Sequence, residues 1–153
     1  MFENTKMELI IRQATLDDVK DILHIYAEAL DHGKVISVEK AQDIFLKQQQ
    51  YPDYQVYVAV YEHQIVGTFA LLIMENMAHL GTPSAVVEDV GVLPAMQGKG
   101  IGKLMMEFAL QYAQEKGCYK MSLSSNLRRE KAHLFYESLG FQKHGFSFLI
   151  DLT

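Results

Sequence analysis

The sequence contains a single cysteine, Cys118, and lacks the hallmarks of several large classes of protein. One cysteine excludes an internal disulfide, so a reducing compartment, the cytoplasm, is the simplest expectation. No apolar run approaches the roughly 20 residues that span a bilayer. Residues 1–6 form a polar tail without the features of a secretion signal. We therefore expect no membrane partner.

Positive charge is also scarce. The chain has 14 Lys and Arg against 19 Asp and Glu, a formal charge of −5, which argues against nucleic acid as a partner. The six histidines show no metal-ligand spacing, so no metal is expected. The 153 residues, 49% of them hydrophobic, suit one folded domain, which we place at residues 7–153.

Segments with helical and with strand-like apolar spacing alternate along the chain. Thr15 is a typical N-cap at the start of the first helix, and Glu62-His63 separates two strands that should form an antiparallel hairpin. The order predicts the α/β class, a mixed (α+β) sheet of about seven strands with helices on both faces. Helices are predicted at residues 16–30, 38–47, 100–116 and 129–139, and strands at 7–13, 55–61, 64–74, 85–92 and 120–124, with two more in 141–151.

The most informative segment is residues 86–104, where an apolar strand leads through a glycine-rich loop into a helix. Backbone N–H groups at such a helix start can bind a phosphate. A P-loop is excluded, because Gln97 replaces its first glycine and Leu104 cannot ligate magnesium. A dinucleotide-binding fingerprint is excluded because Lys103 stands where its third glycine should be.

The pattern that is present is Gln-x-x-Gly-x-Gly, at Gln97, Gly100 and Gly102. It resembles the acetyl-coenzyme A pyrophosphate loop of the GNAT N-acetyltransferase superfamily. Residues 132–141, Ala-His-Leu-Phe-Tyr-Glu-Ser-Leu-Gly-Phe, resemble that superfamily's C-terminal signature. The resemblance implies a GNAT-like sheet with a splayed pair of strands and acetyl-CoA as cosubstrate. It also implies direct attack by a primary amine in a ternary complex.

The resemblance also implies which residues bind the coenzyme. The backbone of Val90, Gly91 and Val92 would pair with the pantetheine arm. For Lys99 and Lys103, a position on a solvent-exposed helix face is as good an interpretation as contact with the phosphates. Asn126 and His133 lie in a string similar to small-amine acetyltransferases of the aminoalkylphosphonate and aminoglycoside type, and both are assigned to the coenzyme. The residues assigned to the pyrophosphate are Gln97, Gly98, Lys99, Gly100, Ile101, Gly102 and Lys103.

Acetyl transfer needs an uncharged amine, yet an alkylamine with a pKa of about 10 is almost entirely protonated at neutral pH. A base must therefore remove a proton. Glu88 is the candidate base by resemblance, with Asp89 or a water chain as alternatives. Strand alternation places Glu88 and Asp89 on opposite faces of their strand. Tyr136 is the candidate acid for the departing thiolate, and a buried structural tyrosine is the alternative interpretation.

The predicted acceptor is a small-molecule amine, bound between the first two helices around residues 26–35 and beside the loop 75–84. One alternative is acetylation of a protein N-terminus or lysine. Another, of a different class, is a non-catalytic acyl-CoA-binding sensor or interaction module. A homodimer is also compatible with the sequence, because dimers are common in the superfamily that the sequence resembles.

Overall fold

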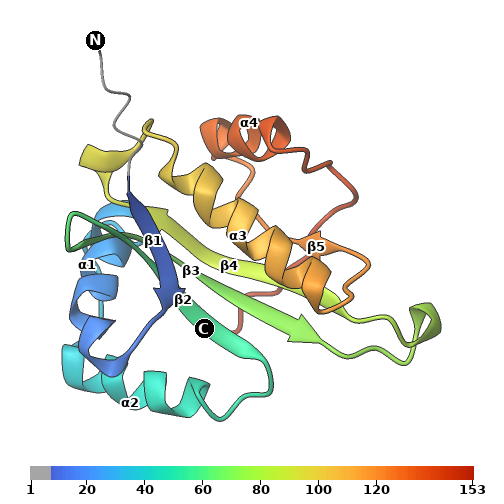
Figure 1. Ribbon diagram of the computed structural model, residues 1–153, viewed down its shortest axis with the longest axis horizontal. Coiled ribbons are helices and arrows are strands. Elements are labelled where there is room, and N and C mark those ends of the chain that lie inside the picture. The colour runs from blue at the N-terminus through green and yellow to red at the C-terminus, as the bar shows by residue number, and fades with distance from the viewer. Residues whose placement is uncertain (1–7) are drawn as a thin grey trace. The chain divides into compact units, whose positions relative to one another are not determined.

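The computed structural model describes residues 8–153, which form two compact units (Figure 1). The first unit ends at Ser122, and the second runs from Leu123 to Thr153. The predicted tail, residues 1–6, and Met7 lie outside the described residues. Placing residues 7–153 in one domain stays a prediction, and the two units are described separately.

The first unit is built on one mixed sheet with the strand order β1-β2-β3-β4-β5. Its first four strands are antiparallel neighbours, whereas β4 and β5 run parallel. Glu62 and His63 join β2 to β3 with φ angles of 48° and 64°, as a two-residue hairpin turn requires. The strands are β1 Leu9–Gln13, β2 Tyr54–Tyr61, β3 Gln64–Met74, β4 Ser84–Val92 and β5 Met121–Ser122.

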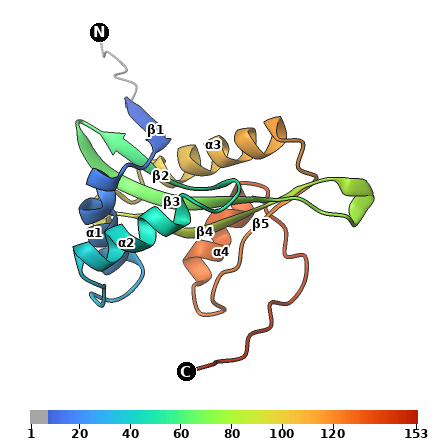
Figure 2. The same cartoon turned by 90° about the horizontal axis from the view of Figure 1, so that it is seen from below.

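Helices cover both faces of this sheet: α1 (Val19–Ala29) and α2 (Val38–Gln48) lie on one side and α3 (Ile101–Glu115) on the other (Figure 2). On the α3 side, Tyr57 and Phe69 stack with their ring centroids 5.1 Å apart. On the other side, α1 and α2 form an apolar core with the sheet. Its buried members are Ala14, Val19, Ile22, Leu23, Ala41, Phe45, Val56, Val58 and Ala70. The predicted α/β class with a mixed sheet is confirmed.

The second unit contains α4 (Glu130–Ser138) and a long irregular segment after it. The two strands predicted in residues 141–151 are absent there, so the described chain has five strands instead of about seven. The apolar side chains of Phe146 and Phe148 in this segment are both 90% exposed. A strand also needs a hydrogen-bonded neighbour, and within this unit the segment has none.

Candidate active site

Strand β4 carries a β-bulge in the middle of the predicted site. Glu88 pairs with Ala70 and Gly91 with Thr68, so three steps along β4 match two along β3. The extra residue lies at Asp89–Val90, and Asp89 has a φ of 52°. A bulge leaves one residue unpaired and interrupts the alternation of side chains. The irregularity that Gly91 suggested is therefore present, but it begins two residues earlier.

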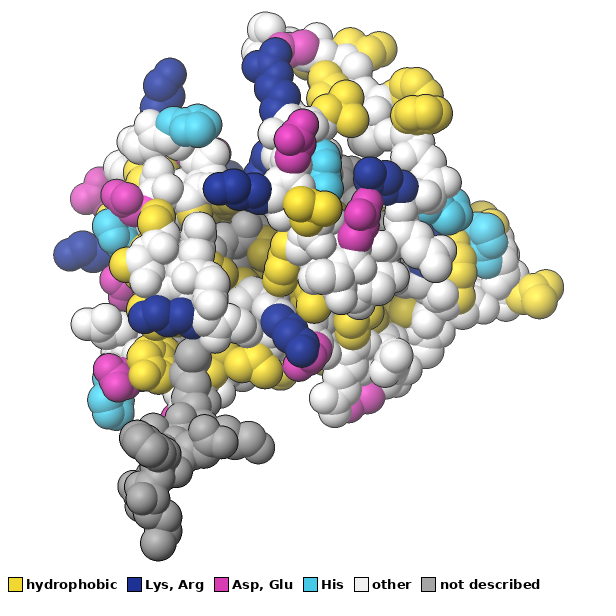
Figure 3. All heavy atoms as spheres, turned by 90° about the horizontal axis from the view of Figure 1, so that it is seen from above, with side chains coloured by type: hydrophobic (Ala, Val, Ile, Leu, Met, Phe, Trp, Pro, Cys, Tyr) yellow, Lys and Arg dark blue, Asp and Glu magenta, His cyan; other side chains and the backbone are white. Residues whose placement is uncertain are grey.

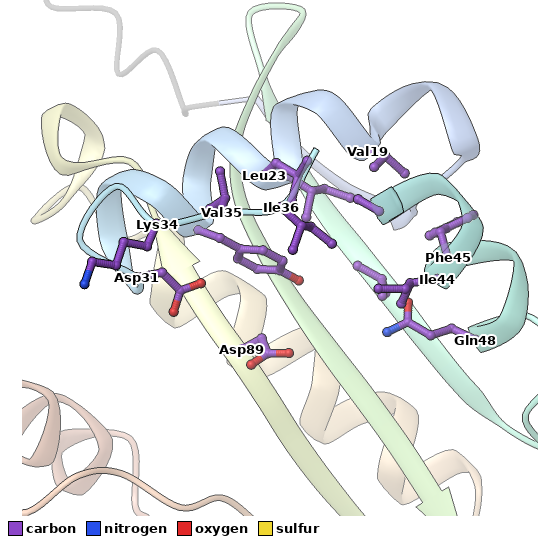
Figure 4. A pocket seen from close by; sticks show the side chains of 14 residues that line it. Val19, Leu23, Asp31, Lys34, Val35, Ile36, Ile44, Phe45, Gln48 and Asp89 are labelled. Carbon is purple, nitrogen blue, oxygen red and sulfur yellow. The ribbon is translucent and has the colours of Figure 1, made fainter. Parts of the chain in front are cut away.

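The bulge brings two carboxylates to the same face of the sheet. Glu88 lies opposite Ala70, a member of the core under α1 and α2. Asp89 lines a pocket on that side, and Figure 4 shows its carboxylate pointing into the cavity. The prediction that these two acids occupy opposite faces is wrong, because it assumed a regular strand without the extra residue.

Both carboxylates hold their protons more tightly than usual. Burial raises the pKa of Asp89, and the neighbouring Asp31 raises it further. Burial also raises the pKa of Glu88, with a second contribution from Asp89. Among residues 8–153, no Lys, Arg or His forms an ion pair with either acid. A carboxylate with a raised pKa is a better base for taking a proton from an amine.

A pocket of about 270 Å³ lies between α1, α2 and the sheet (Figure 4). Its floor is the core just described, and Val35, Ile36 and Ile44 form a more exposed apolar rim. Burial raises the pKa of Tyr26, so this hydroxyl keeps its proton at neutral pH. The polar residues that line the pocket are Tyr26, Asp31, Lys34, Gln48 and Asp89.

The pocket lies partly where the sequence placed the acceptor. Residues 26–35 contribute Tyr26, Asp31, Lys34 and Val35 to its lining, whereas the lining contains no residue of the loop 75–84. Helix α2, the second of the two helices between which the acceptor was placed, contributes Ala41, Ile44, Phe45 and Gln48 to the lining. Its apolar spacing indicated a buried helix face, but nothing in that pattern distinguishes a pocket wall from ordinary core.

The backbone of β4 is open on the side that faces β5. The parallel pairing covers only Ala85 with Met121 and Val86 with Ser122. Beyond these pairs, no described strand pairs with β4 on that side, so the segment from Glu88 to Val92 has an edge without a strand neighbour, although the Val92 carbonyl accepts from Gln97 Nε2. An extended chain such as a pantetheine arm can bind an edge of this kind by main-chain hydrogen bonds.

The glycine loop leaves space for an anion at the start of α3. Gly98 and Gly100 have φ angles of 77° and 86°, and a Cβ at either position would meet nothing within 4 Å. The N–H of Leu104 donates to the carbonyl of Gly100 at 3.1 Å and begins the helical ladder. The earlier amides of the first turn, at residues 101–103, have no acceptor within the helix. The backbone therefore suits a pyrophosphate.

The polar side chains of this loop contact the protein itself. Gln97 Nε2 donates to the carbonyl oxygen of Val92 at 3.1 Å and so ties the loop to the end of β4. Lys103 Nζ lies 3.9 Å from the Glu107 carboxylate one turn along α3, and both side chains are exposed. Lys99 Nζ lies 3.9 Å from the sulfur of Met96. Figure 3 shows Lys and Arg side chains standing out from one face of the molecule, several of them beside acidic ones.

The second unit holds the remaining predicted residues. Tyr136 is buried, with its ring centroid 5.2 Å from that of Phe135 and 5.6 Å from that of Phe141. Burial raises the pKa of this tyrosine, and the nearby Arg129 partly opposes that rise. The hydroxyl therefore stays protonated at neutral pH and can donate a proton.

Asn126 and His133 lie together in this unit. The ring Nε2–H of His133 donates to the Asn126 carbonyl oxygen at 2.9 Å, since a carbonyl can only accept. The Asn126 side-chain oxygen accepts from the Arg128 N–H, also at 2.9 Å. The adjacent Ser125 Oγ is buried without a hydrogen-bond partner among the described residues. A buried hydroxyl of this kind is available to a bound ligand.

Two features are absent from residues 8–153. These residues contain no group of three or more His, Cys, Asp or Glu side chains placed to hold a metal ion. In the same residues, no helix combines the length and the apolar character needed to cross a membrane.

Comparison with known proteins agrees with this geometry. Residues 18–141 match the sequence model of the acetyltransferase (GNAT) family. Glucosamine 6-phosphate N-acetyltransferase of Trypanosoma brucei brucei is 37% identical over 89 residues, which cover 58% of this chain and only 58% of that protein. Aminoalkylphosphonate N-acetyltransferase of Salmonella typhimurium is 27% identical, with 90% of this chain and 88% of that protein covered.

A solved structure of a putative acetyltransferase from Agrobacterium tumefaciens has the same fold. It superposes with a TM-score of 0.87 at 29% identity. The aligned region covers 93% of this chain and 99% of the Agrobacterium chain. The family model alone spans well over half of the sequence. The chain therefore belongs to the GNAT acetyltransferase family, as its two motifs predicted.

Proposed function

We propose that the protein transfers the acetyl group of acetyl-CoA to a primary amine of a small molecule, by direct attack in a ternary complex. The observation that carries this proposal is the arrangement along β4. An acidic pair beside a pocket is followed, within the same strand, by an edge that pairs with no described strand and then by the open glycine loop. Both of the relatives described above are named as acetyltransferases of amine-bearing small molecules.

The acceptor nitrogen is expected to bind in the pocket beside Asp89, with Glu88 accepting its first proton. Acetyl-CoA, when bound, supplies the acetyl group as an activated thioester. The amides near the bulge would donate to the thioester oxygen, because the extra residue interrupts the β3 ladder there.

As the C–N bond forms and the C–S bond breaks, the nitrogen loses its second proton to solvent. The hydroxyl of Tyr136 gives a proton to the departing thiolate and is then reprotonated by solvent. The raised pKa values of Glu88 and Tyr136 suit these roles. Glu88 must take a proton from the amine, and Tyr136 must still hold the proton that it gives to the thiolate.

Binding and turnover test the proposal separately. Calorimetry should detect binding of acetyl-CoA, and thiol release should then accelerate when a primary amine is added. The control is the same mixture without amine, which measures hydrolysis of the thioester alone. Binding without thiol release from any amine would instead support a sensor. Release with peptides but not with small amines would support a protein acetyltransferase.

A further inference from the structure

We infer that the preferred acceptor is a small amine on a hydrocarbon body, without a phosphate or phosphonate group. This inference rests on the proposed function and specifies its substrate class. It departs from the phosphorylated amino sugar for which the trypanosome relative is named. The lining, the charge and the size of the pocket support it.

The lining of the pocket is mainly hydrocarbon. Nine of its fourteen side chains are aliphatic or phenyl groups, and six of these belong to the core between α1, α2 and the sheet. An amino sugar has hydroxyl groups around its ring that would lose their water on entry and find few partners here. A branched alkyl group would instead bury apolar surface against this wall, which is favourable.

The charges inside the pocket favour a cation and disfavour an anion. The carboxylates of Asp31 and Asp89 point into the cavity in Figure 4. Lys34 is the one basic residue among those that line the pocket, and its ammonium group points away from the two carboxylates. A phosphate in this space would therefore face two like charges, whereas an ammonium group would be attracted by both.

The pocket is also small. Its volume of about 270 Å³ lies just below the range of roughly 300–1,000 Å³ that is usual for ligand sites. The rim residues Val35, Ile36 and Ile44 add further, partly exposed apolar surface. A compact alkylamine such as isoamylamine fits this combination of size, lining and charge.

The first experiment compares three amines at saturating acetyl-CoA, with thiol release as the readout. We expect kcat/KM for isoamylamine to exceed that for 2-aminoethylphosphonate and for glucosamine 6-phosphate by at least about tenfold. Preference for either phosphorus-containing amine would overturn the inference and leave the proposed function intact. Absence of thiol release with every amine would overturn both.

A pair of variants in α2 tests whether the apolar wall is responsible. Ile44→Gln changes a side chain that lines the pocket, whereas Leu46→Gln makes a similar change on the outward side of the same helix. Both residues are partly exposed, at 39% and 52%, so both variants should fold. Ile44→Gln should raise KM for isoamylamine by about tenfold, while KM for acetyl-CoA stays the same and Leu46→Gln has no effect. Indistinguishable KM values for the two variants would contradict the inference.

Discussion

The glycine loop and the acceptor pocket both adjoin β4, but they are built in opposite ways. The loop is made of backbone, since its shape depends on positive φ angles at Gly98 and Gly100. The pocket is made of side chains from α1, α2, the segment between them and the sheet. A site made of backbone leaves glycines at fixed spacing, which a sequence reveals. A site made of ordinary apolar side chains leaves no such pattern.

The largest expected effect on this comparison is a loss of kcat when the acidic pair, Glu88 and Asp89, is altered. Glu88→Gln should lower kcat by about 100-fold or more, because a positioned base contributes on that scale. Acetyl-CoA binding, which the loop governs, should survive. The pKa of Glu88 is raised, so the wild-type rate should fall as the pH drops through that value, and the variant should lose this inflection.

The loss in this variant should be largest between the raised pKa of Glu88 and about pH 9, where the carboxylate is ionised and an amine with a pKa of about 10 still carries its proton. Steady-state kinetics from pH 5 to 9 and calorimetry with acetyl-CoA provide the measurements. Equal rates for wild type and variant across that range would exclude Glu88 as the base. The Asp89→Asn variant serves as the comparison, since it removes the other carboxylate of the pair.

Two glycines allow the loop and the neighbouring strand β4 to be perturbed by the same substitution. A Cβ at Gly91 would lie 2.9 Å from Ile25 Cγ2, so Gly91→Ala should cost about 1–3 kcal/mol of unfolding free energy through overpacking. Gly98→Ala meets no neighbouring atom but must adopt a φ of 77°, at a cost of about 1 kcal/mol. Urea denaturation measures both costs.

Acetyl-CoA affinity should change in the opposite order, with the greater loss for Gly98→Ala, because that residue lies in the loop itself. Gly145→Ala is the control, since it is neither crowded nor at positive φ. A larger loss of affinity for Gly91→Ala would show that the loop does not hold the coenzyme independently of the strand.

The smallest expected effect concerns stability. The fold raises the pKa of Asp89 above its unfolded value, so folding is disfavoured once the pH exceeds that raised value and Asp89 is ionised. Because the Asp89 side chain is partly open to solvent, Asp89→Asn should raise Tm only slightly at pH 7. The gain should vanish below about pH 3, where the acid is protonated in both states. Asp43→Asn, in exposed α2 surface, should leave Tm unchanged at both pH values. A loss of stability at pH 7 would mean that Asp89 has a stabilising partner.

The sequence was sufficient for the elements that local patterns define. The hairpin at Glu62-His63, the start of α3 after Gly100 and the order of helices and strands up to β5 all follow from turn chemistry and apolar spacing. For α3, apolar spacing predicts a face that holds Leu104, but Leu104 is 40% exposed, whereas Met106 is fully buried. Both positions are apolar, and spacing alone does not decide between them.

The features that were missed depend on contacts between distant segments. Gly91 signalled an irregular strand, but the bulge centres on Asp89, whose positive φ is not predicted by the regular alternation of apolar residues in the strand. The apolar run in residues 141–151 has strand-like alternation but no pairing partner within its unit. The acceptor was placed between the first two helices, but no local pattern encodes that Asp89 of β4 also lines this pocket.

Because of the bulge in β4, the residue type that is tolerated at position 89 depends on the number of residues in the strand. With one residue fewer, the position of Asp89 would turn towards α3, and its carboxylate would enter an apolar layer that offers it no cation. Length and residue type should therefore change together during evolution. Deleting Val90 should unfold the protein when Asp89 is present and should be tolerated better when position 89 is valine, which thermal denaturation of the two deletion variants can compare.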